Sequence, residues 1–201
     1  MFVIGITGPS GAGKGVVSEY LISQNVNVID ADVVYHEVIS PPSDCLDELV
    51  RHFGQHILDR SGALDRAELA KLVFGEDNRE KLELLNMITH KYVVERIRAL
   101  LKELTLAGAK ACAIDAPLLI EAGLADDCDL TIAVLADKQI RAERIARRDR
   151  IDMSSAMARI NSQKPDEYYV QNSDAVIYNN GDVECLYEAL KKVLTDGGVS
   201  L

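Results

Sequence analysis

Residues 2–15 of this 201-residue chain read FVIGITGPSGAGKG, an apolar run followed by a glycine-rich turn that carries one lysine. The apolar run predicts a buried strand. Gly8, Gly13 and Lys14 match the spacing of a phosphate-binding loop, in which backbone N–H groups surround phosphate oxygens and the lysine contacts the terminal phosphates. Gly15 stands where that pattern has Ser or Thr, whose hydroxyl contacts Mg²⁺. The stretch therefore predicts a nucleotide phosphate site with altered magnesium coordination.

The residues after the lysine, 16–22, have the pattern of a helix, whose N-terminal N–H groups and dipole favour an anion. A glycine-rich turn between a core strand and a helix is the alternative interpretation. With the strand before and the helix after it, a phosphate loop is favoured. The residues expected to contact ATP through this loop are Gly8, Ser10, Gly11, Ala12, Gly13, Lys14, Gly15 and Val16.

Composition restricts the class of protein. With 48% hydrophobic residues, the chain is long enough for one well-buried α/β domain with a helical insertion. Its net charge of -10 argues against a broad nucleic-acid surface, because phosphate backbones are held by clustered Lys and Arg. The four cysteines are widely spaced, and neither an export signal nor an apolar run of 18 residues is visible. These features predict a cytoplasmic protein without a membrane segment.

Five short apolar runs rich in β-branched residues predict buried parallel strands, because helical patterns lie between them. This alternation is typical of a doubly wound sheet, which binds ligands at the carboxyl ends of its strands. The fold class is thus α/β, with a five-stranded parallel sheet like that of the P-loop NTPases. The five runs are 2–7, 26–30, 111–115, 130–135 and 175–178.

About 80 residues separate the second run from the third, which is far more than a simple crossover needs. Helical patterns fill this gap, and the last of them, at 78–104, has apolar residues at every third or fourth position. We therefore expect a helical subdomain inserted at about 33–105. The nucleotide core then consists of about 1–32 and 106–201, and the whole chain, 1–201, forms a single domain.

Aspartates follow two of the predicted strands. Asp32 follows the second strand, where a carboxylate can orient and deprotonate an attacking hydroxyl; the alternative is that Asp30 and Asp32 are helix caps or solvated loop residues. Asp115 ends the third strand, at the position from which an aspartate holds Mg²⁺ directly or through water in many phosphate-loop proteins. A turn-forming role before Pro117 is the alternative for Asp115.

Arginines are concentrated in one predicted helix. Arg141, Arg144 and Arg148 recur at spacings of three and four and therefore share one helix face. Guanidinium groups pair with phosphate oxygens through two parallel hydrogen bonds, so this face can close over a triphosphate and stabilise charge during transfer. The alternative is a solvated face that pairs with neighbouring acidic side chains.

The chain resembles the dephospho-coenzyme A kinases over nearly its whole length. The resemblance rests on short motifs in the correct order. They are the loop at 8–14, Asp30-Ala31-Asp32, Phe53-Gly54, residues 62–66, Leu85-Asn86 with His90, residues 115–121 (DAPLLIE), Arg144-Ile145 with Arg148-Asp149, Ala156 with Arg159-Ile160 and Gln163, and residues 174–181 with Asn179 and Gly181.

The resemblance implies transfer of the γ-phosphoryl group of ATP to the ribose 3′-hydroxyl of dephospho-coenzyme A with Mg²⁺, the last step of coenzyme A synthesis. It implies catalytic roles for Lys14, Asp32 and Arg144, with Arg148 binding ATP. It also implies that the helical insertion binds the acceptor and that a helical lid at about 137–165 carries Arg144 and Arg148. The implied acceptor-binding residues are Asp32, His90, Asp115 and Leu118, and Asp115 is the implied magnesium residue.

Three departures from the family pattern keep other functions open. Gly15 and Val16 replace the usual Ser-Thr pair, His36 replaces an arginine, and Lys91 replaces a proline. One alternative is a divergent kinase of another nucleotide or a small metabolite; another is a nucleotide-binding regulator without catalysis. We expect only small-molecule substrates, no nucleic acid or membrane, and a monomer or weak homo-oligomer.

Overall fold

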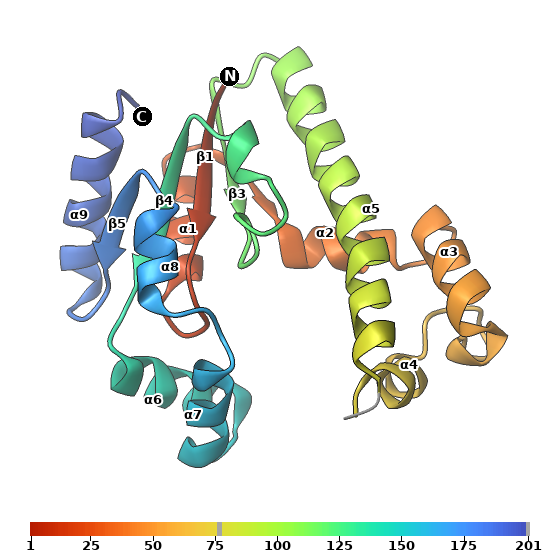
Figure 1. Ribbon diagram of the computed structural model, residues 1–201. Helices are drawn as coiled ribbons and strands as arrows, with labels where there is room; N and C mark the ends of the chain where they lie inside the picture. The colour runs from red at the N-terminus through yellow and green to blue at the C-terminus, as the bar shows by residue number, and fades with distance from the viewer. Residues whose placement is uncertain (76–77, 200–201) are drawn as a thin grey trace. The chain divides into compact units, whose positions relative to one another are not determined.

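A parallel sheet forms the centre of the computed structural model, which describes residues 1–75 and 78–199. Within these residues the sheet has five strands in the order β2-β3-β1-β4-β5, and every pair is parallel (Figure 1). The predicted five-stranded parallel sheet is thus confirmed. The strands are β1 Phe2–Thr7, β2 Asn27–Asp30, β3 Ala111–Asp115, β4 Leu130–Leu135 and β5 Ala175–Tyr178.

The sheet register brings polar residues to one edge. Asp115 at the end of β3 is paired with Ile6 of β1 and with Asp30 of β2. Because parallel strands point the same way, the segments that follow β1 and β3 leave the sheet at this carboxyl edge. The β1 segment is the glycine loop and the β3 segment begins with Ala116, so the phosphate loop and Asp115 belong to one side of the sheet.

Two compact units make up the chain. The first consists of Met1–Asp30 and Leu104–Leu201 and contains the sheet; the second consists of Ala31–Glu103 and is helical. Helices of the first unit are α1 Lys14–Ser23, α6 Lys138–Asp149, α7 Met153–Asn161, α8 Asp166–Gln171 and α9 Val183–Asp196, with a 3₁₀ turn η2 at Ala125–Asp127.

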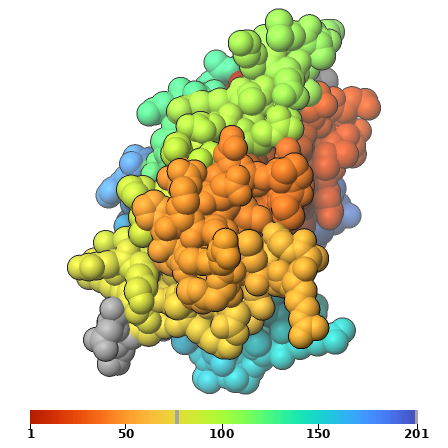
Figure 2. Space-filling view, turned by 90° about the vertical axis from the view of Figure 1, so that its right-hand side faces the viewer, coloured from red at the N-terminus to blue at the C-terminus, as the bar shows by residue number. Residues whose placement is uncertain are grey.

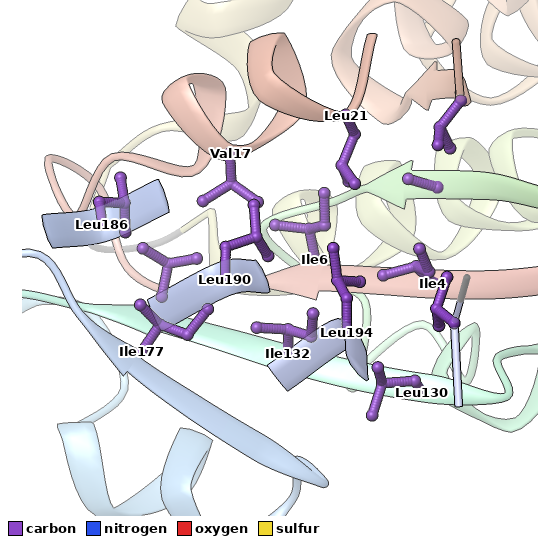
Figure 3. Close-up of a cluster of buried hydrophobic side chains, with 14 of the residues drawn as sticks. Ile4, Ile6, Val17, Leu21, Leu130, Ile132, Ile177, Leu186, Leu190 and Leu194 are labelled. Atoms are coloured by element: carbon purple, nitrogen blue, oxygen red, sulfur yellow. The ribbon is translucent and has the colours of Figure 1, made fainter. Parts of the chain in front are cut away.

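Helices cover both faces of the sheet in the first unit. On one face, α1 and α9 bury leucines and valines against alternate residues of β1, β4 and β5 (Figure 3). On the opposite face, Tyr169 of α8 packs with Ala133 and Leu135 of β4. Successive residues of a strand point to opposite faces, which explains why Ile132 and Val134 join the first cluster while Ala133 and Leu135 join the second.

Helices of the second unit surround a separate apolar cluster. The helices are α2 Ala31–Val38, α3 Asp44–Phe53, α4 Arg66–Val73 and most of α5 Arg79–Leu106, with a 3₁₀ turn η1 at Gln55–Ile57. Figure 2 shows the surface of the α2–α3 segment in orange next to the yellow of α4. Buried members of the cluster are Ile39, Cys45, Leu49, Phe53, Ile57, Leu69, Val73 and Ile88.

Side-chain caps start two helices of the second unit. Ser43 accepts a hydrogen bond from the N–H of Leu46 at the start of α3. Asp65 accepts bonds from the first turn of α4. Caps of this kind satisfy N–H groups that have no partner within the helix, so these starts are encoded locally.

Three elements differ in their bounds from the predictions, and one of them is the helix expected at 78–104, which is α5 Arg79–Leu106. The first helix begins at Lys14 rather than at residue 16, because Gly13 takes the cap position with φ 105° and the chain turns directly into the helix. The second strand begins at Asn27 rather than at residue 26, because the N–H of Val26 bonds to the carbonyl of Leu21 at 3.0 Å and thereby closes the turn after α1.

α5, which has 28 residues, is the longest helix of the described part of the chain. It carries charged side chains along its length, beginning with Arg79, Glu80 and Lys81. Over residues 1–75 and 78–199, no helix combines the length and the apolar character that crossing a membrane requires.

We expect that Leu190→Ala lowers the free energy of unfolding by about 2 to 5 kcal/mol, because Leu190 is fully buried between α9 and the sheet and its loss leaves a cavity. Urea unfolding followed by circular dichroism measures this change. Val183→Ala on the same helix is the control, because Val183 is 44% exposed. An equal loss for both variants would contradict the placement of the core.

Candidate active site

The glycine loop between β1 and α1 has a backbone that side chains would obstruct. Gly8 has φ 137° and Gly13 has φ 105°, both in the region that favours glycine. A Cβ atom on Gly8 would lie 2.1 Å from the carbonyl oxygen of Val134, and one on Gly13 would lie 2.1 Å from Nδ2 of Asn179. The loop therefore packs directly on β4 and on the residue after β5, and this fit requires glycine.

The start of α1 is suited to an anion. No side chain caps this end, and the first turn contains no acidic residue. The N–H groups and the positive end of the helix dipole are thus not neutralised by a carboxylate. Lys14 folds back over the loop, where its Nζ donates to the carbonyl oxygen of Gly8 at 3.1 Å. Together these groups place N–H donors and positive charge at the loop, where the sequence predicts a phosphate.

Asp115 is tied to α1. Its Oδ2 accepts a hydrogen bond from Oγ of Ser18 at 2.7 Å. The strand-end aspartate and the phosphate-loop helix are therefore in direct contact. Nearby, Oγ1 of Thr7 at the end of β1 donates to the carbonyl oxygen of Pro117 at 3.3 Å, which joins the loop side of β1 to the segment after Asp115.

All three predicted arginines contact the phosphate loop, and Arg144 and Arg148 do so with side chains that are partly or largely exposed. Arg144 donates from Nη1 to the carbonyl oxygens of Gly11 and Ala12 at 3.3 and 3.4 Å. Arg148 is more exposed, and its Nη2 lies 3.5 Å from Oγ of Ser10. Both guanidinium groups thus lie beside the loop, within reach of a ligand that the loop holds.

The third arginine departs from the prediction of a phosphate-facing side chain. Arg141 is 1% exposed, and its guanidinium group donates to the protein itself. Its acceptors are the carbonyl oxygen of Ser10 at 3.0 Å, Oε1 of Gln163 at 2.9 Å and Oδ1 of Asp166 at 3.2 Å. Burial lowers the pKa of Arg141 and Asp166 opposes this shift. Because Arg141 is buried, it hydrogen-bonds to protein groups, and its bond to Ser10 anchors the phosphate loop.

Two residues that the family resemblance names only as motif members, Gln163 and Asn179, shape the loop. Gln163 accepts the N–H of Ser10 through Oε1 at 3.2 Å. Asn179 is 6% exposed, and its Nδ2 donates to the carbonyl oxygen of Ala12 at 2.8 Å. Asn179 follows β5 directly, so its place at the carboxyl end of a strand was the available signal. Gln163 follows α7 and not a strand, so its only signal was its place among the motif residues of the resemblance.

Predicted residues of the acceptor site are distributed over both units. Asp32 is exposed in the first turn of α2, and His90 is partly exposed on α5, so both belong to the second unit. Leu118 follows β3 in the first unit and is 45% exposed. His36 stands where the family pattern has arginine, and its Nδ1 lies 2.6 Å from Nη2 of Arg66. A cationic side chain from another helix is thus present beside this position.

The end of α6 is held by an ion-pair cluster. Asp149 accepts hydrogen bonds from Arg148 and Arg159, which lie on α6 and α7. The Arg148 hydrogen bond, supported by Arg159, lowers the pKa of Asp149 to about 2. The carboxylate therefore stays ionised, and it orients the guanidinium group of Arg148 at the side of the loop.

Fold and site together define a class. A strand, a glycine loop and a helix that bind phosphate, in a parallel sheet with arginines beside the loop, are the features of P-loop kinases. The dephospho-CoA kinase family model matches residues 2–184. This chain belongs to the dephospho-CoA kinase family, and it is a kinase.

Curated relatives extend over nearly the whole chain. A dephospho-CoA kinase of Carboxydothermus hydrogenoformans is 37% identical over 192 residues, which cover 96% of this chain and 92% of that protein. A dephospho-CoA kinase of Corynebacterium glutamicum is 36% identical over 196 residues, which cover 98% of this chain and 97% of that protein.

Solved structures agree with this fold. TT1252 from Thermus thermophilus has a TM-score of 0.78 and 32% identity and covers 97% of both chains. Dephospho-CoA kinase from Campylobacter jejuni has a TM-score of 0.71 at 24% identity, with 98% of this chain and 97% of that chain covered. Shikimate kinase from Acinetobacter baumannii shares the fold, with a TM-score of 0.53 at 16% identity. The match covers 98% of this chain and 93% of that chain.

We expect that Gly13→Ala weakens ATP binding about tenfold or more, because a left-handed φ costs a residue with a Cβ about 1 to 2 kcal/mol and the new methyl group must displace Asn179 from the loop. Isothermal titration calorimetry with ATP measures the affinity. Gly181→Ala is the control, since its Cβ would lie an ordinary 3.8 Å from Cys185. Equal ATP affinity of Gly13→Ala and the unchanged protein would contradict the loop geometry.

Proposed function

We propose that this protein transfers the γ-phosphoryl group of ATP to the ribose 3′-hydroxyl of dephospho-coenzyme A and releases coenzyme A and ADP. The observation that carries the proposal is the glycine loop flanked by Lys14, Arg144 and Asp115, in a chain that matches its family over residues 2–184. The curated relatives with the same extent carry the name of this activity.

ATP would be held by the phosphate loop through groups that favour a polyanion. Backbone N–H groups of the loop and of the first turn of α1 would donate hydrogen bonds to oxygens of the β and γ phosphates. Lys14 would exchange the neutral carbonyl of Gly8 for a phosphate oxygen, since hydrogen bonds between charged partners are about twice as strong. These local positive charges supply the attraction for phosphate that the net charge of -10 of the whole chain does not.

Mg²⁺ fits the oxygen chemistry at the end of β3. In the described part of the chain, no three His, Cys, Asp or Glu side chains come together as a metal cage. Mg²⁺ is commonly held by one or two carboxylates together with substrate phosphates and water, so a single aspartate is sufficient. Asp115 would hold the ion, directly or through water, and the ion would neutralise charge on the transferred phosphoryl group.

Asp32 is proposed as the base. The new bond forms between the acceptor's 3′-oxygen and the γ-phosphorus, while the bond from that phosphorus to the β–γ bridging oxygen breaks. The proton of the hydroxyl passes to the Asp32 carboxylate, and ADP leaves with the bridging oxygen. Arg144 and Arg148, beside the loop on α6, would stabilise charge on the phosphates during transfer.

Acceptor binding and closure of the site would be the tasks of the helical parts of the chain. The second unit, with Asp32 and His90, would bind the acceptor, and the helices at about 137–165 would act as the lid. Leu118, exposed after β3, would contact the acceptor. We place the protein in the cytoplasm as a monomer or weak homo-oligomer that acts on small molecules.

An assay coupled to ADP release should show Mg²⁺-dependent turnover with ATP and dephospho-coenzyme A. A panel of other hydroxyl acceptors, including nucleosides, nucleotides and shikimate, should give little turnover. Turnover with another acceptor and none with dephospho-coenzyme A would reject the acceptor. ATP binding without turnover of any acceptor would indicate a nucleotide-binding regulator.

Asp32→Asn should lower kcat by about 10² to 10⁴-fold, which is the typical contribution of a general base, and leave ATP affinity nearly unchanged. Steady-state kinetics and calorimetry with ATP separate these two effects. Asp30→Asn is the matched control, because Asp30 lies two residues earlier at the end of β2. The reverse pattern, with Asp30→Asn inactive and Asp32→Asn active, would move the base to Asp30.

A further inference from the structure

Position 15 lacks the hydroxyl of the general phosphate-loop pattern, although space for it exists. In that pattern the residue after the lysine contributes its hydroxyl to Mg²⁺. Gly15 is exposed in the first turn of α1, and a Cβ atom added to it would meet no heavy atom within 4 Å. Its φ lies outside the region reserved for glycine. The absence of a hydroxyl at this position is therefore not required by packing.

A hydroxyl is present one turn further along the same helix. Ser18 follows Gly15 by three residues, so both positions lie on one face of α1. Ser18 is 7% exposed, and its Oγ lies 2.7 Å from Oδ2 of Asp115. The residue thus reaches the strand-end aspartate, which is the proposed magnesium residue.

An ordinary helix hydrogen bond is the competing interpretation of Ser18. Serines in helices often donate to the carbonyl four residues earlier, and Oγ of Ser18 lies 3.2 Å from the carbonyl oxygen of Lys14. A hydroxyl has one proton, and the Asp115 oxygen is nearer and charged, so it is the stronger acceptor. The contact also joins elements that are 97 residues apart in the chain.

We propose that Ser18 is a positioning residue, which orients the Asp115 carboxylate for Mg²⁺ and so compensates for the missing hydroxyl at Gly15. The inference rests on the proposed function, because it assigns Mg²⁺ to Asp115. Groups that hold a metal-binding carboxylate by hydrogen bonds fix its orientation, and their removal typically costs 10- to 100-fold in metal affinity. Ser18 acts through Asp115 and does not touch the reacting atoms.

The test measures metal binding without catalysis. Mn²⁺ replaces Mg²⁺ as a paramagnetic probe, and a non-hydrolysable ATP analogue replaces ATP. Electron paramagnetic resonance then measures the affinity of Mn²⁺ for the enzyme–analogue complex. Ser18→Ala should weaken Mn²⁺ binding about tenfold, while the affinity for the analogue without metal stays unchanged. In turnover assays the Mg²⁺ concentration for half-maximal rate should rise, with kcat at saturating Mg²⁺ largely kept.

A second-site variant separates positioning from a general loss of structure. Gly15→Ser in the Ser18→Ala background should restore most of the Mn²⁺ affinity, because position 15 has room for the side chain. Ser23→Ala is the matched control on α1, since the Ser23 hydroxyl is exposed and its hydrogen bonds are local, to the carbonyl of Tyr20 and from Nε2 of Gln24. It should leave Mn²⁺ affinity unchanged.

Unchanged Mn²⁺ affinity in folded Ser18→Ala overturns the proposal, and so does an enzyme–analogue complex that binds no Mn²⁺. If Ser18→Ala unfolds in circular dichroism, Ser18→Cys decides, because a thiol is a weak donor of similar shape and should weaken Mn²⁺ binding to a smaller degree. These measurements need no acceptor. A protein that shows the Mn²⁺ effect but does not turn over dephospho-coenzyme A would therefore reject only the proposed acceptor.

Discussion

One buried guanidinium group connects the phosphate loop to the helices that follow β4. Arg141 donates to the carbonyl of Ser10, to Gln163 and to Asp166, and it is almost entirely removed from solvent. A buried charge costs several kcal/mol unless its hydrogen bonds are satisfied, so these acceptors must stay in place for the charge to be tolerated. Gln163 also accepts the N–H of Ser10, and the two side chains therefore hold both backbone polar groups of Ser10.

Burial along α6 divides three similar side chains into three environments. Arg141 is buried, Arg144 is partly exposed and contacts loop carbonyls, and Arg148 is exposed beside Ser10. Phosphate oxygens are stronger partners for a guanidinium group than neutral carbonyls or hydroxyls, so the loop contacts of Arg144 and Arg148 are the ones that a nucleotide can replace. The contacts of Arg141 secure the loop on which that nucleotide would lie.

Sequence reasoning succeeded where short-range patterns carry the information. Apolar runs predicted the five strands, and the errors in element bounds are of one to two residues, as where the Gly13 cap begins α1 and the turn at Val26 precedes β2. It was wrong about Arg141, because a spacing of three and four places side chains on one helix face but does not say which neighbours cover them. Asp32 and His90 both lie on the helical second unit, and their roles in the acceptor site stay predictions.

The strand, glycine loop and helix at the start of the chain followed from sequence alone, because apolar periodicity, glycine φ angles and the start of a helix are local properties of about twenty residues. Tertiary structure decided the contacts that set the chemistry around this loop. Asn179 packs on Ala12, and Ser18 binds Asp115, across separations of 167 and 97 residues. Such pairs depend on sheet order and register, which bring the ends of distant strands together and which no local pattern encodes.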